Sequence, residues 1–522
     1  MVKQGEANEV VPLYCFDPNH FGTTPYGNMK TGNYRAQFLL EAVLDLKKNL
    51  RSIGSDLLIH LGKPADALAG LLPAEGKTTI LSQTEVASEE MRVEREVRRA
   101  TKGKAQMIQL WGHTLYHPSD LPFAATMGDL PDVFTPFRNK VESRCQPRQL
   151  VPAPTTGALP LPPDLDAQRL EYAPSRVEDL NVIVPEGAQP LATPQLPAQA
   201  VLQFKGGETA ALARLKYYLW DSDLLATYFD TRNGMLGGDY STKFSPWLAH
   251  GCLSPRTIYH EIRKYEAQRT QNKSTYWVIF ELIWRDFFRF FTVKHGDRIF
   301  HEYGTSGKRV RWQDNRELFL RWREGRTGMP LVDANMRELN ATGFMSNRGR
   351  QNVASYLALD LGCDWRLGAD WFESVLQDYD VCSNWGNWVS AAGMTGSRIN
   401  HFNITKQSKD YDLQGAYIRT WVPELKNVPA LRIHEPWLMS KAEQEQAGVR
   451  IGADYLAPIP RSAFASPHAG TEEVRGGGRG GGFRGGRGGR GRGGRGQGPL
   501  DAGPSGRRQR RSGPKGDFER FG

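Results

Sequence analysis

The hydrophobic pattern of this chain of 522 residues changes once, close to Gly206, and that change limits the fold more than any other feature. Before it, short apolar runs typical of strands alternate with longer stretches of helical periodicity. The strand-like runs lie at 9–16, 56–62, 78–84 and 105–111, and the helical stretches at 34–53 and 86–100. Such alternation predicts an α/β domain with a parallel, Rossmann-like sheet of the doubly wound kind.

Beyond Gly206 the strand pattern disappears and helical periodicity dominates. The predicted helices lie at 207–229, 255–268, 275–294, 315–324, 331–341, 349–361, 368–376 and 415–421. Between the two patterns is a stretch rich in Pro and small residues that has little periodicity. We therefore expect an α/β domain, a Pro-rich linker, a large all-α domain and a tail, at 1–145, 146–205, 206–464 and 465–522.

The tail is predicted to be disordered, because its Gly-rich sequence has almost no apolar area to bury. Residues 471–522 carry 13 Lys and Arg against 5 Asp and Glu, so most of the net charge of +10 belongs to the tail. Arg-Gly-Gly repeats of this kind bind RNA or single-stranded DNA through phosphate contacts and guanidinium stacking. A solubilising tail without a defined ligand is the alternative.

The five cysteines are scattered and form no Cys-x-x-Cys pair, so we expect neither a disulfide framework nor a metal site. A reducing, intracellular compartment is the default for such a chain, and both nucleus and cytoplasm stay open. The basic cluster at 507–511 is one candidate nuclear address. No apolar run is long enough for a transmembrane helix, so no membrane partner is expected. We expect a monomer.

Polar residues that suit a phosphate group gather at 241–246, just before a helical segment. Ser241, Thr242 and Ser245 supply hydroxyls, and Lys243 supplies a cation beside Phe244. Hydroxyls and backbone N–H groups at a helix start suit a pyrophosphate. The same pattern is also that of an ordinary helix cap.

A second polar cluster, at 378–388, combines two carboxylates, a carboxamide and indoles. Asp378, Asp380 and Asn384 are spaced over one or two helical turns. Buried carboxylates are costly unless they meet cations or the N–H groups of a ligand, and Arg350 is a natural counter-ion. Contact with a flavin-sized ligand and a structural salt bridge that caps a helix are both open.

Taken together, the motifs at 228–234, 242–247, 281–287, 329–337, 342–348 and 378–388 resemble, in order and content, those of the photolyase/cryptochrome family, in particular its cryptochrome DASH subgroup. The resemblance covers about 9–440. It implies a blue-light-absorbing protein that holds FAD inside the helical domain. By matched position, the FAD contacts would come from Tyr228, Ser241, Thr242, Lys243, Phe244, Ser245, Arg285, Arg350, Asp378, Asp380 and Asn384, the last of them facing the flavin N5.

The resemblance also implies an activity: light-driven electron transfer from reduced flavin that splits cyclobutane pyrimidine dimers, mainly in single-stranded DNA. This is a carbon–carbon lyase reaction, and photolyases flip the lesion into a cavity. Glu281 would hydrogen-bond the dimer, Trp284 would stack on it, and Asn384 would complete the catalytic set. The matched DNA contacts are Arg232, Glu281, Trp284, Asn347, Arg348 and Gln407.

Three indoles, Trp388, Trp365 and Trp312, match the family's electron-transfer chain from flavin to surface, although any single Trp is more often a core residue. In the N-terminal domain, Glu89 or Glu90 lies near the matched contact for an antenna folate, 5,10-methenyltetrahydrofolate. A solvated charged helix face is the alternative there.

Two departures from the family pattern stand out. The family's opening strand with its Arg-Asn/Asp-Leu-Arg motif is absent, so we expect a sheet without its first strand, and an incomplete start also leaves an organelle open as the compartment. Ser390 occupies a position where the family usually has Tyr or Trp against the lesion. That residue favours a second possibility, a blue-light photoreceptor or regulator with little repair activity, and a third is a regulator that binds RNA or single-stranded DNA through its tail.

Overall fold

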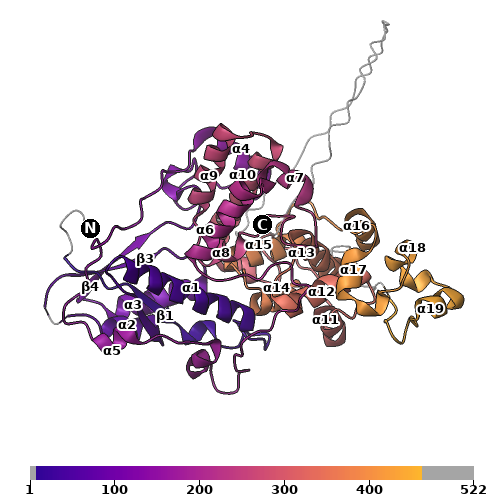
Figure 1. Cartoon of the computed structure of the whole chain (residues 1–522), viewed down its shortest axis with the longest axis horizontal. Coiled ribbons are helices and arrows are strands. Elements are labelled where there is room, and N and C mark those ends of the chain that lie inside the picture. Colours follow the sequence, from indigo (N-terminus) through magenta and orange to yellow (C-terminus); the bar gives the residue numbers. More distant parts are fainter. Residues whose placement is uncertain (1–7, 74, 461–522) are drawn as a thin grey trace, which may run out of the picture.

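The computed structural model describes residues 8–73 and 75–460, so the predicted tail lies outside the described residues, as does the end of the predicted all-α domain. Figure 1 shows the N-terminal α/β part on one side of the molecule and the C-terminal helices on the other, with α10 (Lys273–His295) between them. Across the described ranges, no helix combines the length and apolar character needed to cross a membrane.

Two pairs of parallel strands form the N-terminal sheets. β1 (Leu13–Phe16) pairs with β2 (Leu58–Leu61), and β3 (Thr78–Gln83) pairs with β4 (Ala105–Leu110). The parallel pairing and the α/β class are confirmed, but the strands make two sheets of two rather than one continuous sheet. In a doubly wound sheet the first strand lies between the two halves. The described residues place no strand there, so the two pairs stay separate.

Helices surround these sheets and then make up the rest of the described chain. In the N-terminal part they are α1 (Asn33–Ser52), α2 (Pro64–Ala69), α3 (Ser88–Ala100), α4 (Phe134–Arg144) and α5 (Ala167–Glu171). Next along the chain, before α10, are α6 (Glu208–Lys216), α7 (Tyr228–Thr231), α8 (Ser245–Ala249) and α9 (Pro255–Gln268). The C-terminal helices are α11 (Arg316–Arg323), α12 (Pro330–Thr342), α13 (Asn347–Ser355), α14 (Trp365–Val375), α15 (Val381–Ala391), α16 (Ile404–Tyr411), α17 (Ala416–Trp421), α18 (Ala430–Ile433) and α19 (Lys441–Ala447).

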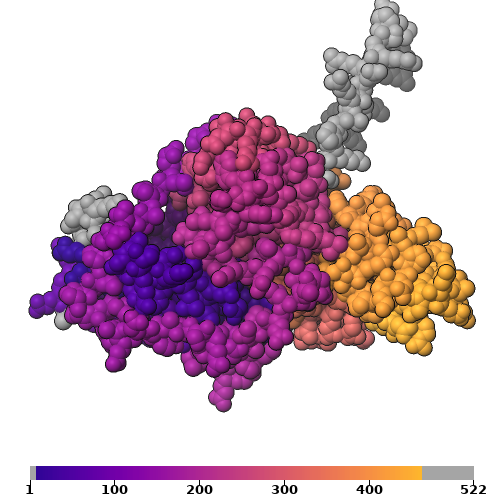
Figure 2. All heavy atoms as spheres, viewed as in Figure 1, coloured from indigo at the N-terminus to yellow at the C-terminus, as the bar shows by residue number. Residues whose placement is uncertain are grey.

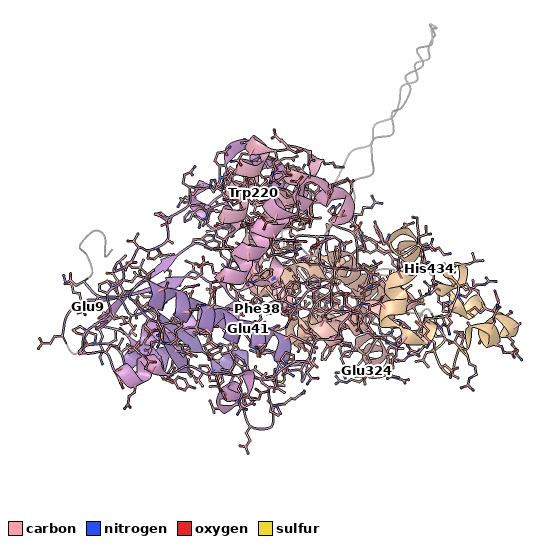
Figure 3. The ribbon with its side chains drawn as sticks, in the orientation of Figure 1. Glu9, Phe38, Glu41, Trp220, Glu324 and His434 are labelled. Atoms are coloured by element: carbon pink, nitrogen blue, oxygen red, sulfur yellow. The ribbon has the colours of Figure 1, made fainter. Side chains whose placement is uncertain are left out.

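One large hydrophobic core joins the N-terminal part to the helical part. Phe38 of α1 packs against Trp247 of α8 at 6.2 Å between ring centroids, near the centre of the molecule in Figure 3. The backbone at Gly206 lies so close to α1 that a Cβ there would be 2.1 Å from the Phe38 carbonyl oxygen. Only glycine fits such an approach. The boundary seen in the sequence is therefore a tightly packed junction, and the space-filling view shows the two parts in contact there (Figure 2).

The predicted linker at 146–205 is partly structured. It contains α5 and a 3-10 helix at Val177–Ile183. Val177, Leu180 and Ile183 are buried in the core beneath β1 and β2. Apolar side chains three residues apart eclipse one another in a 3-10 helix, so even a short one can present a buried face. The segment covers the N-terminal domain.

Candidate functional site

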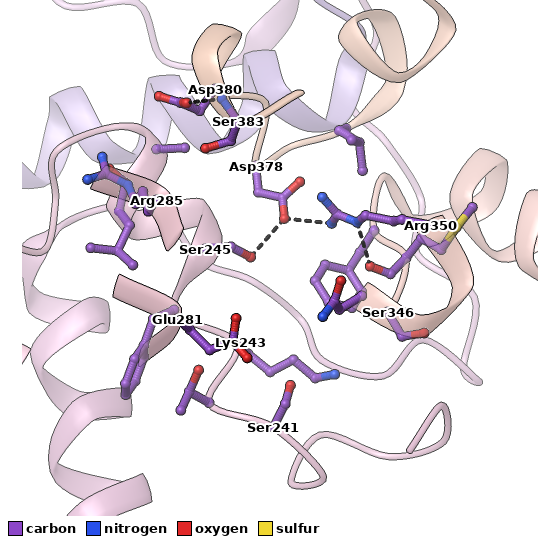
Figure 4. A pocket seen from close by; sticks show the side chains of 18 of the residues that line it. Ser241, Lys243, Ser245, Glu281, Arg285, Ser346, Arg350, Asp378, Asp380 and Ser383 are labelled. Carbon is purple, nitrogen blue, oxygen red and sulfur yellow. Dashed lines mark hydrogen bonds and ion pairs between the residues drawn. The ribbon is translucent and has the colours of Figure 1, made fainter. Parts of the chain in front are cut away.

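A pocket of about 1170 Å³ opens in the helical part, lined by side chains from segments that are far apart in the sequence. Of the predicted site residues it brings together Tyr228, Arg232, Ser241, Thr242, Lys243, Phe244, Ser245, Glu281, Arg285, Asn347, Arg350, Asp378, Asp380 and Asn384. Figure 4 shows several of them pointing toward a common space. A concave lining that combines apolar side chains with a few convergent polar groups suits an organic cofactor.

Asp378 and Arg350 form a buried ion pair at one side of the pocket. Arg350 donates from Nη2 to Asp378 Oδ2 at 2.6 Å and from Nε to the Met345 carbonyl at 2.9 Å. Ser245 donates its hydroxyl to the same Asp378 oxygen at 2.7 Å. The other oxygen, Oδ1, is buried and has no hydrogen-bond partner among the described residues. A buried acceptor without a partner is costly, so it suits a ligand that brings a donor such as the flavin N3–H.

The loop at 241–244 turns sharply before α8. Lys243 adopts a left-handed backbone conformation with φ of 62°, which is uncommon for a residue other than glycine. Its Nζ lies 3.1 Å from the centre of the Tyr240 ring and has no hydrogen-bond partner among the described residues. Burial lowers the pKa of Lys243 well below its usual range. An anionic group such as the cofactor diphosphate would supply the counter-charge that favours the protonated amine.

Asp380 caps α15 and connects the pocket to the N-terminal part. Its carboxylate accepts the Ser383 backbone N–H at 2.7 Å, and His113 Nε2 lies 3.3 Å away. Arg285 donates to the His113 carbonyl at 2.5 Å. Burial alone would raise the pKa of Asp380, but His113, Arg285 and Arg289 hold it well below its usual range. Asp380 is therefore ionised, and His113, whose pKa burial lowers to about 4, is neutral near pH 7.

His113 is a site residue that the sequence did not indicate. It follows β4, in a part of the chain predicted to bind an antenna, and it contacts a carboxylate that is 267 residues away. The same loop is fixed by Asp286 of α10, which accepts the backbone N–H groups of Leu115 and Tyr116 at 2.9 and 2.8 Å. No local pattern predicts a contact over such a separation.

Glu281 lies on the pocket wall close to a cation. Its Oε1 is 4.0 Å from Arg232 Nη1. Burial raises the pKa of Glu281 to about 7, while Arg232, a hydrogen bond with Trp277 and Arg348 act in the opposite direction. A carboxyl group that holds a proton near neutral pH can donate a hydrogen bond to a ligand carbonyl.

Three of the predicted DNA contacts, Trp284, Arg348 and Gln407, are not among the residues that line the pocket. The Trp284 ring stacks on Phe134 of α4, with 3.6 Å between centroids and 7° between planes, and it is not among the residues that line the pocket. Arg348 donates to Asn233 at 2.8 Å and its guanidinium lies 4.4 Å from the Tyr411 ring centre. Gln407 belongs to α16. Their roles with DNA stay predictions.

The three indoles of the predicted electron-transfer chain lie in the aromatic core. Trp388 and Trp365 are fully buried, and Trp312 packs against the same core. Two of them each pack against a further Trp: Trp388 lies 6.0 Å from Trp322, and Trp365 lies 5.9 Å from Trp385, between ring centroids. These contacts suit aromatic packing as well as electron hopping, so the route is still a prediction.

Glu89 and Glu90 are on α3 and differ in their surroundings. Glu89 pairs with Lys30 at 2.6 Å and is half exposed. Glu90 Oε2 is buried without a hydrogen-bond partner among the described residues, and burial raises the pKa of that carboxyl. Neither residue lines the pocket described above. An antenna contact at Glu90 stays a prediction.

A metal centre is not evident in the described ranges: they contain no group of three or more His, Cys, Asp or Glu side chains that could hold an ion. The pocket's donor set instead fits FAD. It offers a buried carboxylate oxygen without a donor, a buried ammonium without an acceptor, and hydroxyls beside them. These match the needs of an isoalloxazine ring and a diphosphate.

Comparison with known proteins agrees with this fit. Residues 277–471 match the FAD binding domain of DNA photolyase, and residues 4–157 match DNA photolyase. The chain is 53% identical to "Cryptochrome DASH, chloroplastic/mitochondrial" of Ostreococcus tauri, over 90% of this chain and 88% of that protein. It is 50% identical to Cryptochrome DASH of Gloeobacter violaceus, over 86% of this chain and 87% of that protein.

A solved structure gives the same result. The crystal structure of a Synechocystis cryptochrome superimposes with a TM-score of 0.81 at 46% identity, covering 90% of this chain and 93% of that one. The family and fold predicted from the motifs are confirmed. The chain belongs to the photolyase/cryptochrome family, in its cryptochrome DASH subgroup.

Proposed function

We propose that this protein uses FAD and blue light to split cyclobutane pyrimidine dimers, mainly in single-stranded DNA. The observation that carries the proposal is the pairing of two features in one pocket: the buried Asp378–Arg350 pair and the protonatable Glu281 on the wall. When bound, reduced FAD supplies the electron that opens the cyclobutane ring and accepts it back after the bonds have broken.

The chain's own residues would hold that cofactor in a fixed orientation. Asp378 would accept the ring's N3–H through its free oxygen, and Arg350 would keep that carboxylate ionised. Lys243 and the hydroxyls of Ser241 and Ser245 would meet the diphosphate and ribityl chain. Asn384 donates to the Ala369 carbonyl at 2.9 Å and its Oδ1 is buried without a partner among the described residues, so its amide would be held toward the flavin N5.

Glu281 and Arg232 would contact the lesion. A protonated Glu281 can donate to a pyrimidine carbonyl, which stabilises the negative charge that the dimer carries after electron transfer. Arg232 and Asn347, which line the pocket, would meet a phosphate or a base edge. The near-neutral body favours single strands, because extruding a dimer from a duplex costs stacking and pairing energy.

A direct test is repair of a dimer-containing single-stranded oligonucleotide under blue light. We expect the dimers to split in the light and to persist in the dark, and splitting in the matched duplex to be slower. Equal loss of dimers in light and dark would contradict the proposal, since the reaction would then not use the excited cofactor.

We propose a second function, a blue-light receptor with little repair, on the evidence of Ser390. This half-buried residue on α15 offers a hydroxyl where the resemblance leads us to expect an aromatic ring. Replacing Ser390 with Tyr should tighten binding of a dimer-containing single strand about threefold to tenfold, because a stacked ring adds about 0.5–1.5 kcal/mol. The measurement is fluorescence anisotropy with lesion-free oligonucleotide as control. An unchanged ratio of the two affinities would show that position 390 does not face the lesion.

His113 should control how tightly the cofactor is held. Replacing His113 with Ala removes the imidazole whose Nε2 contacts both Asp380 and Arg285, so both charges lose a fixed partner and we expect FAD to dissociate about tenfold more readily. Equilibrium dialysis of FAD measures this. His260→Ala is the matched control, because His260 is on α9, does not line the pocket and hydrogen-bonds the Arg148 carbonyl at the surface. Equal FAD affinity in both variants would contradict the role of His113.

The antenna and the compartment complete the proposal. We propose that a folate, 5,10-methenyltetrahydrofolate, binds beside Glu90, whose buried carboxyl oxygen can accept from a pterin N–H. An excitation spectrum of flavin emission would then carry a near-ultraviolet band that Glu90→Gln weakens.

We propose an intracellular, reducing location, organelles included, because relatives from Ostreococcus tauri and Arabidopsis thaliana are named chloroplastic/mitochondrial.

A further inference from the structure

A stack of aromatic rings and guanidinium groups borders the pocket at Glu281. The Arg232 guanidinium packs against two rings, 5.1 Å from the centre of Phe229 and 4.8 Å from the centre of Trp277. The two rings meet edge to face at 4.7 Å, and Phe280 also packs against Trp277, with 4.5 Å between ring centroids. Such cation–π contacts are strong when the cation is desolvated, and the Arg232 side chain is only 4% exposed.

Trp277 touches both of the polar groups that face the lesion. It is one helical turn before Glu281 on α10, so the two side chains share a face of the helix. Its indole N–H is hydrogen-bonded to the Glu281 carboxyl group, while its ring carries Arg232. Glu281 and Arg232 are themselves 4.0 Å apart, too far for a hydrogen bond of their own. The indole is the element that fixes them together.

We propose that Trp277 is a positioning residue for repair: it orients the Glu281 carboxyl group through its indole N–H and holds the Arg232 guanidinium on its ring face. The proposal rests on the proposed function for its effect on repair. Its physical content, the link from Trp277 to Glu281, does not depend on that function.

The groups around Glu281 determine in which direction its pKa should change when the Trp277 N–H is removed. Arg232 from α7 and Arg348 from α13 favour the ionised carboxylate, burial favours the neutral acid, and Tyr228 of α7 is the other titratable neighbour. The hydrogen bond from Trp277 stabilises the ionised form. Removing the N–H should therefore raise the pKa of Glu281, and repair should persist to higher pH.

The test separates the N–H from the ring. Trp277→Phe keeps an aromatic face for Arg232 but removes the donor, whereas Trp277→Leu removes both. Infrared titration of the Glu281 carboxyl stretch, identified by its loss in Glu281→Gln, reports the midpoint directly in the full-length flavoprotein. We expect Trp277→Phe to shift the midpoint upward by about one pH unit. In repair assays the substrate KM should stay near wild type for Trp277→Phe and rise about fivefold to tenfold for Trp277→Leu.

Trp220→Phe is the matched control, because the Trp220 indole also donates to a carboxylate, Glu261, at 2.9 Å, but on α9 away from the pocket. It should leave the Glu281 midpoint unchanged. If Trp277→Phe does not fold, benzothienylalanine at position 277 keeps the fused ring and removes only the N–H. A midpoint equal to wild type in these donor-free variants would overturn the proposal. Because the titration needs no lesion, a wild-type protein without repair activity would refute the proposed function and leave this link testable.

Discussion

Replacing Glu281 with Ala should lower the rate of dimer splitting about a hundredfold while FAD stays bound. The reason is that a donor aimed at developing charge in a buried site contributes most of its energy to the reaction itself, and removing one typically costs two to three orders of magnitude. Glu281 lines the pocket beside Arg232, 4.0 Å away, and its burial keeps it protonatable. The measurement is the initial rate of repair per absorbed photon, with flavin content checked by visible absorbance.

A second variant and a pH profile test whether the loss is specific to the Glu281 proton. Glu281→Gln keeps a neutral donor of similar shape, so it should retain far more activity than the Ala variant. The wild-type rate should also depend on pH. Because burial raises the pKa of Glu281 from 4.5 to about 7, the protonated form is present at pH 6 and lost by pH 8, and repair should fall about tenfold across that range. Repair that is flat between these pH values, with Glu281→Ala as active as wild type, would remove Glu281 from the mechanism.

The second large effect is expected at the Asp378–Arg350 pair. Replacing Asp378 with Ala leaves Arg350 buried without its counter-ion and removes the acceptor for the flavin N3–H, so we expect loss of most bound FAD and a destabilisation of about 3–5 kcal/mol. The ratio of visible to ultraviolet absorbance measures the bound FAD. Chemical denaturation of the purified protein measures the loss of stability.

The matched control is Asp364→Ala, which breaks the Arg366–Asp364 pair. That pair has the same 2.6 Å separation, but its side chains are 23% and 19% exposed rather than 11% and 1%. Because Asp364 also caps α14, its loss should cost about 1–2 kcal/mol, and it should leave FAD content unchanged. If both variants kept their FAD, the buried pair would have no special role in cofactor binding.

The sequence predicted long apolar helices well and sheet assembly less well. The helix predicted at 275–294 is α10 at Lys273–His295. Its prediction was accurate because the helix is apolar and buried on nearly all sides. By contrast, the helix predicted at 207–229 ends early: α6 stops at Lys216, and Asp223 takes a left-handed conformation with φ of 58°. Periodicity cannot reveal such a break, because the apolar pattern continues through it.

Some residues of the candidate site could be predicted from the sequence, and others could not. Asp378, Arg350 and the 241–245 segment were found because short motifs carry them, and the pocket does bring them together. His113 and Trp277 were missed, since their importance comes from contacts with Asp380 and with Arg232 that only the folded chain creates. Trp284 came from the family resemblance; its ring stacks on Phe134 and it is not among the residues that line the pocket, so its role stays a prediction.

The most direct test of the account is the visible absorption spectrum of the purified full-length protein after incubation with FAD and removal of unbound cofactor. The pocket described here, with the free oxygen of Asp378 and the buried ammonium of Lys243, predicts a protein that retains FAD in close to one-to-one ratio. A protein that comes through this procedure colourless would contradict the central claim, since the pocket residues assigned here would then not hold FAD.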